Sequence, residues 1–248
     1  MAVSSSTNGA DTPFADITHF RSLIGALQYL AITRPDIQFA VNRVAQRMHQ
    51  PSEHDYHCLK RILRYIFGTL GRGLLIRPGD LELRGFSDSD WANDKNDRKS
   101  TSGFLVFLGP NLISWCTKKQ PKVSRSSTEA EYRALALLAD ETMWVEYILL
   151  ELRATHIVPA LYCDNKSTNC VAKNSVLHTR MKHVDTDCLF VRDEVQDGTM
   201  TVQYVTTEEQ LADILTKPLP SRQHDYLSSK LSFSSAQLSL RGDNNIYY

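Results

Sequence analysis

The sequence lacks the features of several large protein classes. Its five cysteines form no Cys-x-x-Cys pair and are odd in number, which argues against a zinc knuckle or a disulfide framework and favours a reducing compartment. No apolar run approaches the roughly 20 residues that a membrane-spanning helix needs. The polar start, MAVSSSTNGADTP, has no charged region followed by an apolar one, as a secretory signal would have. We therefore expect an intracellular protein, cytoplasmic or nuclear, without a membrane partner.

An excess of charge of either sign is also absent, because 28 Lys and Arg residues balance 28 Asp and Glu residues. This balance argues against a globally basic nucleic-acid binder, but a neutral total can still contain a local basic surface. The 248 residues, 42% of them hydrophobic, are enough for one large or two small domains with a real core.

Helical periodicity covers the first third of the chain. Apolar residues recur at spacings of three and four over residues 17–31 and again after Pro35, which suits a first helical position. Ser52 is placed to cap a third helix, which stops at the glycine-rich GTLGRG. We predict a disordered start over residues 1–16 and a helical segment over residues 17–77.

After residue 80 the apolar period changes from that of a helix to that of strands. LRGFSDSDWAND, residues 83–94, predicts a strand that ends in aspartates, and Gly109-Pro110-Asn111 predicts the turn of a hairpin. The later pattern predicts a long helix over residues 127–152, a buried strand in IVPALYCD, helices over 166–173 and 184–195, a strand in TMTVQYVT, and a last helix in TTEEQLADILTK with Thr207 and Gln210 as a capping box. We therefore predict an α/β domain over residues 81–218 and a poorly ordered tail over residues 221–248.

Acidic residues stand at four positions in this α/β part. They are Asp88 or Asp90 after the first strand, Glu131 in the long helix, Asp164 after the buried strand, and Asp213 in the last helix. In open α/β sheets, functional groups gather beyond the carboxyl ends of neighbouring strands. Four carboxylates at one point repel one another, so the cluster is tolerable around hard cations such as Mg²⁺. Two such ions suit phosphodiester hydrolysis.

Each of these residues also has a structural interpretation. The aspartates after the first strand, Asp94 included, could form turns, and Asp164 could cap the helix that follows it. Glu131 could be a favourable anion near a helix N-terminus. Asp213 could pair with Lys217 at i+4, which is worth only ~0.3 to 0.5 kcal/mol. The residue pattern alone does not choose between these interpretations, nor between Asp88 and Asp90.

Six long motifs, which follow one another along the chain, resemble those of a known family, and this resemblance does choose between the interpretations. GFSDSDWAND, RKSTSGFLVFLGPNLISWCTKKQ, SRSSTEAEYRAL, LYCDNKS, HTRMKHVDTDCLFVRDEV and YVTTEEQLADILTKPL together resemble the ribonuclease H (RNase H) domain of copia-type (Ty1/copia) retrotransposon Pol polyproteins. The upstream helical stretch resembles the segment that joins the reverse transcriptase to that domain. The resemblance covers roughly residues 17–220.

The resemblance implies a fold, a reaction and a set of residues. It implies an RNase H-like α/β fold, with a five-stranded mixed sheet and flanking helices after a small three-helix segment. It also implies cleavage of the RNA strand of RNA–DNA hybrids with two Mg²⁺ ions, for which Mn²⁺ could substitute, and no small-molecule cofactor. The residues that match the family's catalytic and metal-binding carboxylates are Asp88, Glu131, Asp164 and Asp213, whereas Glu129 points elsewhere on its helix. His183, in KHVDTD, receives no catalytic step.

Some parts of such polyproteins have no counterpart in this sequence. The aromatic-x-Asp-Asp turn of the polymerase palm is absent. We therefore expect a truncated piece of a Pol polyprotein that does not synthesise DNA and that has a reverse transcriptase polymerase domain as a partner. An alternative interpretation is a catalytically silent nucleic-acid-binding or docking remnant. An integrase-like transferase fits less well, because its carboxylates would follow the order Asp, Asp, Glu, whereas the order here is Asp, Glu, Asp, Asp.

A local basic surface is predicted on either side of the hairpin. Between residues 95 and 125 Asp97 is the only acidic residue. Lysines and arginines there would contact phosphates without reading sequence. The predicted nucleic-acid-binding residues are Lys95, Arg98, Lys99, Lys118, Lys119, Lys122 and Arg125.

Overall fold

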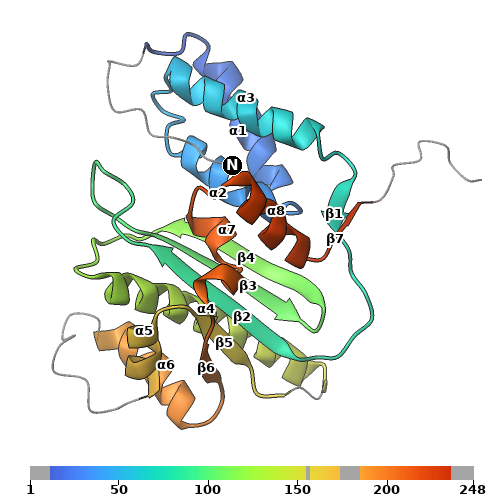
Figure 1. Ribbon diagram of the computed structural model, residues 1–248, viewed down its shortest axis with the longest axis vertical. Helices are drawn as coiled ribbons and strands as arrows, with labels where there is room; N and C mark the ends of the chain where they lie inside the picture. Colours follow the sequence, from blue (N-terminus) through green and yellow to red (C-terminus); the bar gives the residue numbers. More distant parts are fainter. Residues whose placement is uncertain (1–11, 155–156, 174–184, 236–248) are drawn as a thin grey trace, which may run out of the picture.

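A computed structural model describes residues 12–154, 157–173 and 185–235 of the chain (Figure 1). The chain begins with three helices, α1 (Ile17–Leu30), α2 (Pro35–Ala45) and α3 (Glu53–Phe67). Pro35 opens α2 as predicted, and Ser52 caps α3 by accepting a hydrogen bond from the Asp55 amide. The buried apolar faces of the three helices form one core, which includes Phe20, Ile24, Leu27, Ile37, Val41, Leu59 and Ile62. The predicted three-helix segment is therefore present.

Five strands form one mixed sheet in the order β4-β3-β2-β5-β6. β2, β3 and β4 are antiparallel neighbours, whereas β5 lies parallel to β2 and β6 parallel to β5. The predicted five-stranded mixed sheet is confirmed, and the strands that carry or precede Asp88 and Asp164 are neighbours in it. The strands are β2 (Leu83–Asp90), β3 (Thr101–Leu108), β4 (Asn111–Lys119), β5 (Ala160–Cys163) and β6 (Thr201–Tyr204).

The long helix α4 (Ser127–Glu151) covers one face of the sheet, with α5 (Lys166–Lys173) and α6 (Asp185–Gln196) beside it (Figure 1). Gly85 lets α4 lie close to β2, because a Cβ there would come within 2.6 Å of the Leu138 side chain. The hydrophobic core between α4 and the sheet includes Leu83, Phe104, Val106, Tyr132, Leu135, Leu138, Leu161 and Val202. Of the helices that the structure describes, none is both long and apolar enough to cross a bilayer.

The opposite face of the sheet carries short elements, and here the structure differs from one prediction. TTEEQLADILTK was predicted as a single helix but forms a 3-10 turn, η2 (Thr207–Glu209), and then a four-residue helix, α7 (Asp213–Thr216). Thr207 and Gln210 form no capping box. The helix is interrupted between η2 and α7, because the Gln210 side chain turns inward and donates a hydrogen bond to the Ser87 carbonyl of β2 at 2.9 Å.

The structure also differs from the predictions at both ends. The tail predicted as poorly ordered from residue 221 contains α8 (Ser221–Lys230) and β7 (Phe233–Ser235), which pairs with β1 (Arg72–Leu74). Leu227 of α8 is fully buried, so packing orders a segment whose sequence is mostly polar. At the other end, within the predicted disordered start, Pro13 forms a β-bridge with Ser52. His183 lies outside the described residues.

The helical segment packs against the sheet domain beside β4, α7 and α8 (Figure 1). Trp115 of β4 donates its indole N–H to the Ala31 carbonyl at 3.1 Å, and the Asn42 side-chain amide donates to the Thr117 carbonyl at 3.1 Å. The helices therefore lie next to the end of the sheet that carries the acidic residues.

Candidate metal centre

Asp88 lies near the end of β2, the central strand, and is fully buried. Strand residues alternate between faces, so Asp88 points toward α7 whereas Gly85 faces α4. Thr216 Oγ1 donates a hydrogen bond to Asp88 Oδ2, and Lys217 Nζ donates one to Oδ1 at 3.0 Å. Asp88 is therefore held through both carboxylate oxygens, by the last residue of α7 and by the residue that follows it.

Glu131 reaches the same place from α4. Its Oε1 accepts a hydrogen bond from the Ser89 amide at 3.3 Å, and its Oε2 lies 3.8 Å from the donating Cys163 thiol. Asp164 follows β5, and its Oδ2 accepts a hydrogen bond from Thr207 at 3.1 Å. Because β5 is parallel to β2, the two carboxyl ends meet at one edge of the sheet.

Asp213 is the first residue of α7, and the sheet holds that short helix in place. The Gln210 side chain joins Ser87 on β2 to the Ala212 amide, which donates to Gln210 Oε1 at 3.2 Å. Thr117 of β4 donates a hydrogen bond to the Leu215 carbonyl at 2.9 Å. These contacts fix the position of Asp213 although α7 has only one turn.

The four predicted carboxylates come together in two overlapping groups. Asp88, Asp164 and Asp213 each offer an oxygen within 4.8 Å of the others, and Glu131, Cys163 and Asp164 form a second group of the same size. Carboxylate oxygens are the ligands that Mg²⁺ and Mn²⁺ prefer. Cys163 is a poorer ligand for them, and burial first and then Glu131 raise the pKa of its thiol. The cluster could therefore hold a divalent cation through its oxygens.

The charges of the cluster are only partly compensated. Burial, followed by the charge of Asp88, raises the pKa of Asp164 above its ordinary value and the pKa of Glu131 well above it. The same two causes, in the same order, raise the pKa of Asp213 to about 7. Shifts of this direction mean that each ionised form is disfavoured by the others and by the loss of water. A divalent cation would relieve both effects, so the residues present fit such an ion.

Lys217 was predicted only as an i+4 partner of Asp213, but it contacts two carboxylates. Its Nζ lies 2.8 Å from Asp213 Oδ1 and 3.0 Å from Asp88 Oδ1. Burial alone would lower the pKa of Lys217, but Asp88 and then Asp213 outweigh it and raise the pKa above the ordinary value. The i+4 spacing was the signal for the first contact. No local signal indicated the second, or the roles of Thr207 and Gln210.

Other acidic residues near the cluster have separate roles. Asp90 is half-buried, burial raises its pKa, and neither group of ligand atoms found among the described residues includes it. Asp94 accepts a hydrogen bond from the Asn96 amide at 2.9 Å and pairs with Lys119, as a turn residue does. Glu129 accepts one from the Arg125 amide and pairs with Arg133, each at 2.8 Å. It therefore stabilises the start of α4, away from the cluster.

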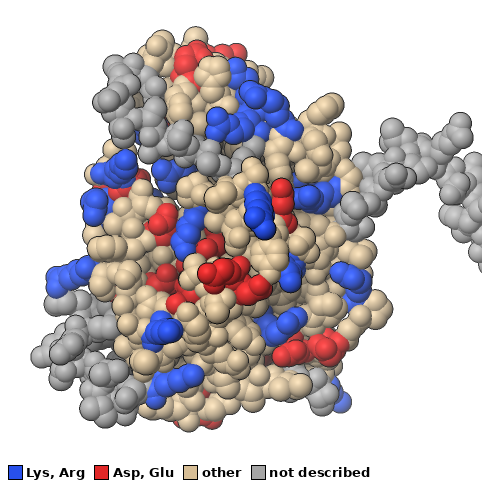
Figure 2. Space-filling model, viewed as in Figure 1, with Lys and Arg blue, Asp and Glu red and all other residues tan. Residues whose placement is uncertain are grey.

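The predicted basic residues lie at the same end of the sheet as Asp88. The register pairs Asp88 with Gly103 and Gly103 with Thr117, so the loops around residues 95–99 and 118–125 flank that end. Lys95, Arg98, Lys118, Lys122 and Arg125 are exposed, whereas Lys99 and Lys119 are half-buried. Lys119 contacts Asp94 and Asp97, so its charge is already partly compensated. Figure 2 shows acidic side chains near the middle of one face, with basic side chains close beside them and also toward the margins.

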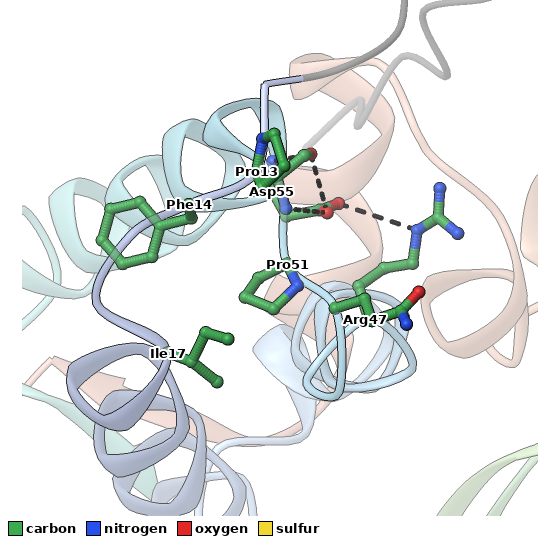
Figure 3. Close-up of a pocket in the computed structure, with 8 residues that line it drawn as sticks. Pro13, Phe14, Ile17, Arg47, Pro51 and Asp55 are labelled. Carbon is green, nitrogen blue, oxygen red and sulfur yellow. Dashed lines mark hydrogen bonds and ion pairs between the residues drawn. The ribbon is translucent and has the colours of Figure 1, made fainter.

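A separate hollow lies on the helical segment (Figure 3). Pro13, Phe14, Ile17 and Pro51 form its apolar lining. Its polar lining includes Asp55, which accepts a hydrogen bond from the Ser52 amide at 2.9 Å and lies 3.9 Å from the Arg47 guanidinium. The same bond closes the N-terminus of α3, so these polar groups already serve the fold.

Comparisons with known proteins find retrotransposon polyproteins that are similar to most of this chain. It is 48% identical over 223 residues to the retrovirus-related Pol polyprotein from transposon RE1 of Arabidopsis thaliana. These residues make up 89% of this chain and 15% of that polyprotein. It is 37% identical over 207 residues to the retrovirus-related Pol polyprotein from transposon TNT 1-94 of Nicotiana tabacum. These residues make up 83% of this chain and 16% of that polyprotein. No protein-family model matches the chain.

A comparison with solved structures finds RNase H domains. The N-terminal RNase H domain of a Mycobacterium tuberculosis protein is similar with a TM-score of 0.38 and 16% identity. That similarity covers 60% of this chain and 98% of that domain.

Proposed function

We propose that this chain, which resembles the copia-type retrotransposon Pol polyproteins over most of its length, is an RNase H-type endonuclease that cleaves the RNA strand of RNA–DNA hybrids by two-metal-ion phosphodiester hydrolysis. The observation that carries the proposal is the approach of Asp88, Asp164 and Asp213 within 4.8 Å at one edge of the sheet, with Glu131 beside them. The chain spans only 15–16% of the length of the polyproteins named above. The activities of those whole polyproteins are therefore not assumed for it.

In this proposal the four carboxylates hold Mg²⁺, or Mn²⁺ in its place. Bound as a pair, such ions activate a water molecule and stabilise the leaving oxygen of a phosphodiester. The protein supplies the arrangement: Gln210 and Thr117 fix α7, and the Ser89 amide orients Glu131. Thr207 orients Asp164 in the same way. The ligands are thus positioned before any ion arrives.

The exposed basic residues around the hairpin are proposed to hold the hybrid. Contacts from Lys95, Arg98, Lys118, Lys122 and Arg125 to phosphates would make binding depend on salt but not on base sequence. Recognition of a hybrid duplex would then depend on its shape and its 2′-hydroxyl groups. A reverse transcriptase polymerase domain is the proposed protein partner, and no DNA synthesis is expected of this chain.

Cleavage of a labelled hybrid tests the proposal. With Mg²⁺ the purified chain should cut the RNA strand of an RNA–DNA hybrid and spare single-stranded RNA. Asp164→Asn should lower the cleavage rate by more than about 100-fold, since even the loss of a group that merely supports a ligand costs about 10- to 100-fold. Asp140→Asn, the same change at an exposed position of α4, should leave the rate unaltered. Hybrid binding without cleavage above the Asp164→Asn level would instead support the silent remnant.

A further inference from the structure

Lys217 lies directly after the short helix that carries Asp213. Its backbone is extended, with φ −123° and ψ 147°, and its amide donates a hydrogen bond to the Asp213 carbonyl. The side chain then folds back over the first residue of α7. The ammonium group lies between two carboxylates from different elements, 2.8 Å from Asp213 Oδ1 and 3.0 Å from Asp88 Oδ1.

These two oxygens belong to residues of the group that could hold a divalent cation. Asp88, Asp164 and Asp213 offer ligand atoms within 4.8 Å of one another, and the ammonium contacts two of the three. Asp88 Oδ2 accepts a hydrogen bond from Thr216, whereas Oδ1 accepts the one from Lys217, which a cation on this oxygen would have to displace. A divalent ion bound there and the ammonium would repel each other at a few ångströms.

The ammonium also serves the metal-free protein. Its positive charge lies 3.0 Å from Asp88 Oδ1 and 2.8 Å from Asp213 Oδ1, and so offsets part of the repulsion between these carboxylates. About 30% of the Lys217 side chain is exposed. A lysine is a compact charge on a flexible four-carbon stem. The ammonium can therefore leave for water without moving the backbone.

We propose that Lys217 is a tethered counter-ion of the metal centre: its ammonium occupies the position between Asp88 and Asp213 in the metal-free protein and leaves when a divalent cation binds. The inference rests on the metal centre of the proposed function and adds a regulation to it. Lys217 stabilises the metal-free fold and weakens the affinity for metal, since an ion must displace it. Lys217 is a positioning residue here, because it acts through the carboxylates.

Mn²⁺ binding without nucleic acid tests the competition. Mn²⁺ is a spectroscopic replacement for Mg²⁺ at oxygen ligands, and the electron paramagnetic resonance signal of free Mn²⁺ gives the affinity. Lys217→Gln should bind Mn²⁺ about tenfold more tightly, the scale set by one charge-assisted hydrogen bond. Its metal-free form should melt at a lower temperature than the wild type, and Mn²⁺ should raise its melting temperature more. An unchanged or weaker Mn²⁺ affinity would overturn the inference.

Lys119→Gln is the matched control. Lys119 also contacts two aspartates, Asp94 and Asp97, and its side chain is 28% exposed against 30% for Lys217. It lies outside both groups of ligand atoms found among the described residues. Its replacement should leave the Mn²⁺ affinity of the metal centre unchanged. An equal gain in Lys119→Gln would mean that any loss of positive charge tightens binding, and would also overturn the inference.

A measurement on the wild type covers the case in which Lys217→Gln does not fold. Mild acetylation followed by peptide mapping reports how readily each lysine amine reacts. Mg²⁺ should increase the acetylation rate of Lys217 severalfold and leave that of Lys119 unchanged. No increase at Lys217 would overturn the inference. Neither measurement uses a nucleic acid, so a chain that binds metal but fails to cut hybrids would lose the proposed function and keep this inference.

Discussion

Asp88, Asp90 and Asp94 lie within seven residues of one another but have different surroundings. Asp88 is buried on the α7 face and lies among ligand oxygens. Asp90 shares that face by alternation but stands at the end of the strand, half-buried, and Asp94 belongs to the loop with Lys119. At this scale a shift of two residues along β2 separates a candidate metal ligand from a residue of the rim.

Replacing each aspartate of β2 separately should distinguish them. Asp88→Asn removes the carboxylate that meets both Asp164 and Asp213, so hybrid cleavage should fall by more than about 100-fold. Asp90→Asn should keep the rate within about tenfold of the wild type, because no ligand atom is lost. Initial cleavage rates at saturating Mg²⁺ provide the measurement. The reverse ranking would place the catalytic aspartate at position 90.

The stability of the metal-free protein should depend on pH through Asp213. Its pKa is raised from 3.8 to about 7 in the folded protein, so the folded state takes up a proton more readily than the unfolded state. This group therefore contributes stability below pH 4, and that contribution is lost as the pH rises through 7. Urea unfolding in EDTA between pH 4.5 and pH 8 should show the decline. Asp213→Asn should show a shallower decline, and an identical slope would contradict the assignment.

Short elements, rather than long ones, determine the site. α7 has only four residues and cannot be stable by itself, since isolated helices shorter than about 12 residues are marginal in water. It holds its place because Gln210 and Thr117 attach it to two strands, and because Gly103 leaves space for it. Gly103 lies opposite Asp88 in the register of β2 and β3. The distance between Asp88 and Asp213 therefore depends on residue 103 being a glycine, which has no side chain.

Gly103→Ala should damage the site by pushing α7 away. A Cβ at position 103 would come within 2.7 Å of Thr216 Cγ2 and 2.8 Å of Leu215 Cβ, so α7 must move. The variant should lose roughly 1–3 kcal/mol of unfolding free energy, and it should bind Mn²⁺ more weakly. Gly73→Ala is the control, because a Cβ on that strand glycine would meet no atom within 4 Å. Equal effects of the two changes would show that α7 is not held by this contact.

The sequence predicted the elements whose apolar period is long and regular. The three N-terminal helices, the hairpin, α4 and the succession of strands along the chain all follow from periodicity and turn residues, and the four carboxylates follow from the resemblance. The break between η2 and α7 could not be predicted, because the inward turn of Gln210 depends on a carbonyl 123 residues away. The second contact of Lys217 spans 129 residues for the same reason. Long-range polar contacts leave no periodic trace in the sequence.

The helical segment and the sheet domain are joined by the C-terminal helix. In the helical segment, the buried Asp36 carboxylate accepts hydrogen bonds from Arg34 at 2.7 and 2.8 Å and from Tyr65 at 2.8 Å. The His224 ring of α8 lies 3.2 Å from the Asp36 carbonyl, with Leu227 in the core shared with β3 and α7. α8 thus touches both parts of the molecule. Its mostly polar sequence gave no sign of this, because its burial arises from packing alone.

Removing α8 should therefore weaken the whole molecule rather than only its end. A chain ending at residue 220 loses Leu227 and Leu231, both fully buried, and exposes the surface that they cover. The truncation of a single buried leucine costs about 2–5 kcal/mol, so the melting temperature should fall by at least about 10 °C. The control is the full-length chain, which keeps α8 and β7. Melting followed by circular dichroism and by tryptophan fluorescence should give coincident curves for the control. The curves should separate for the shorter chain, because the helical segment can then unfold before the sheet. Equal melting temperatures would mean that the contacts of Trp115 and Asn42 suffice to hold the two parts together.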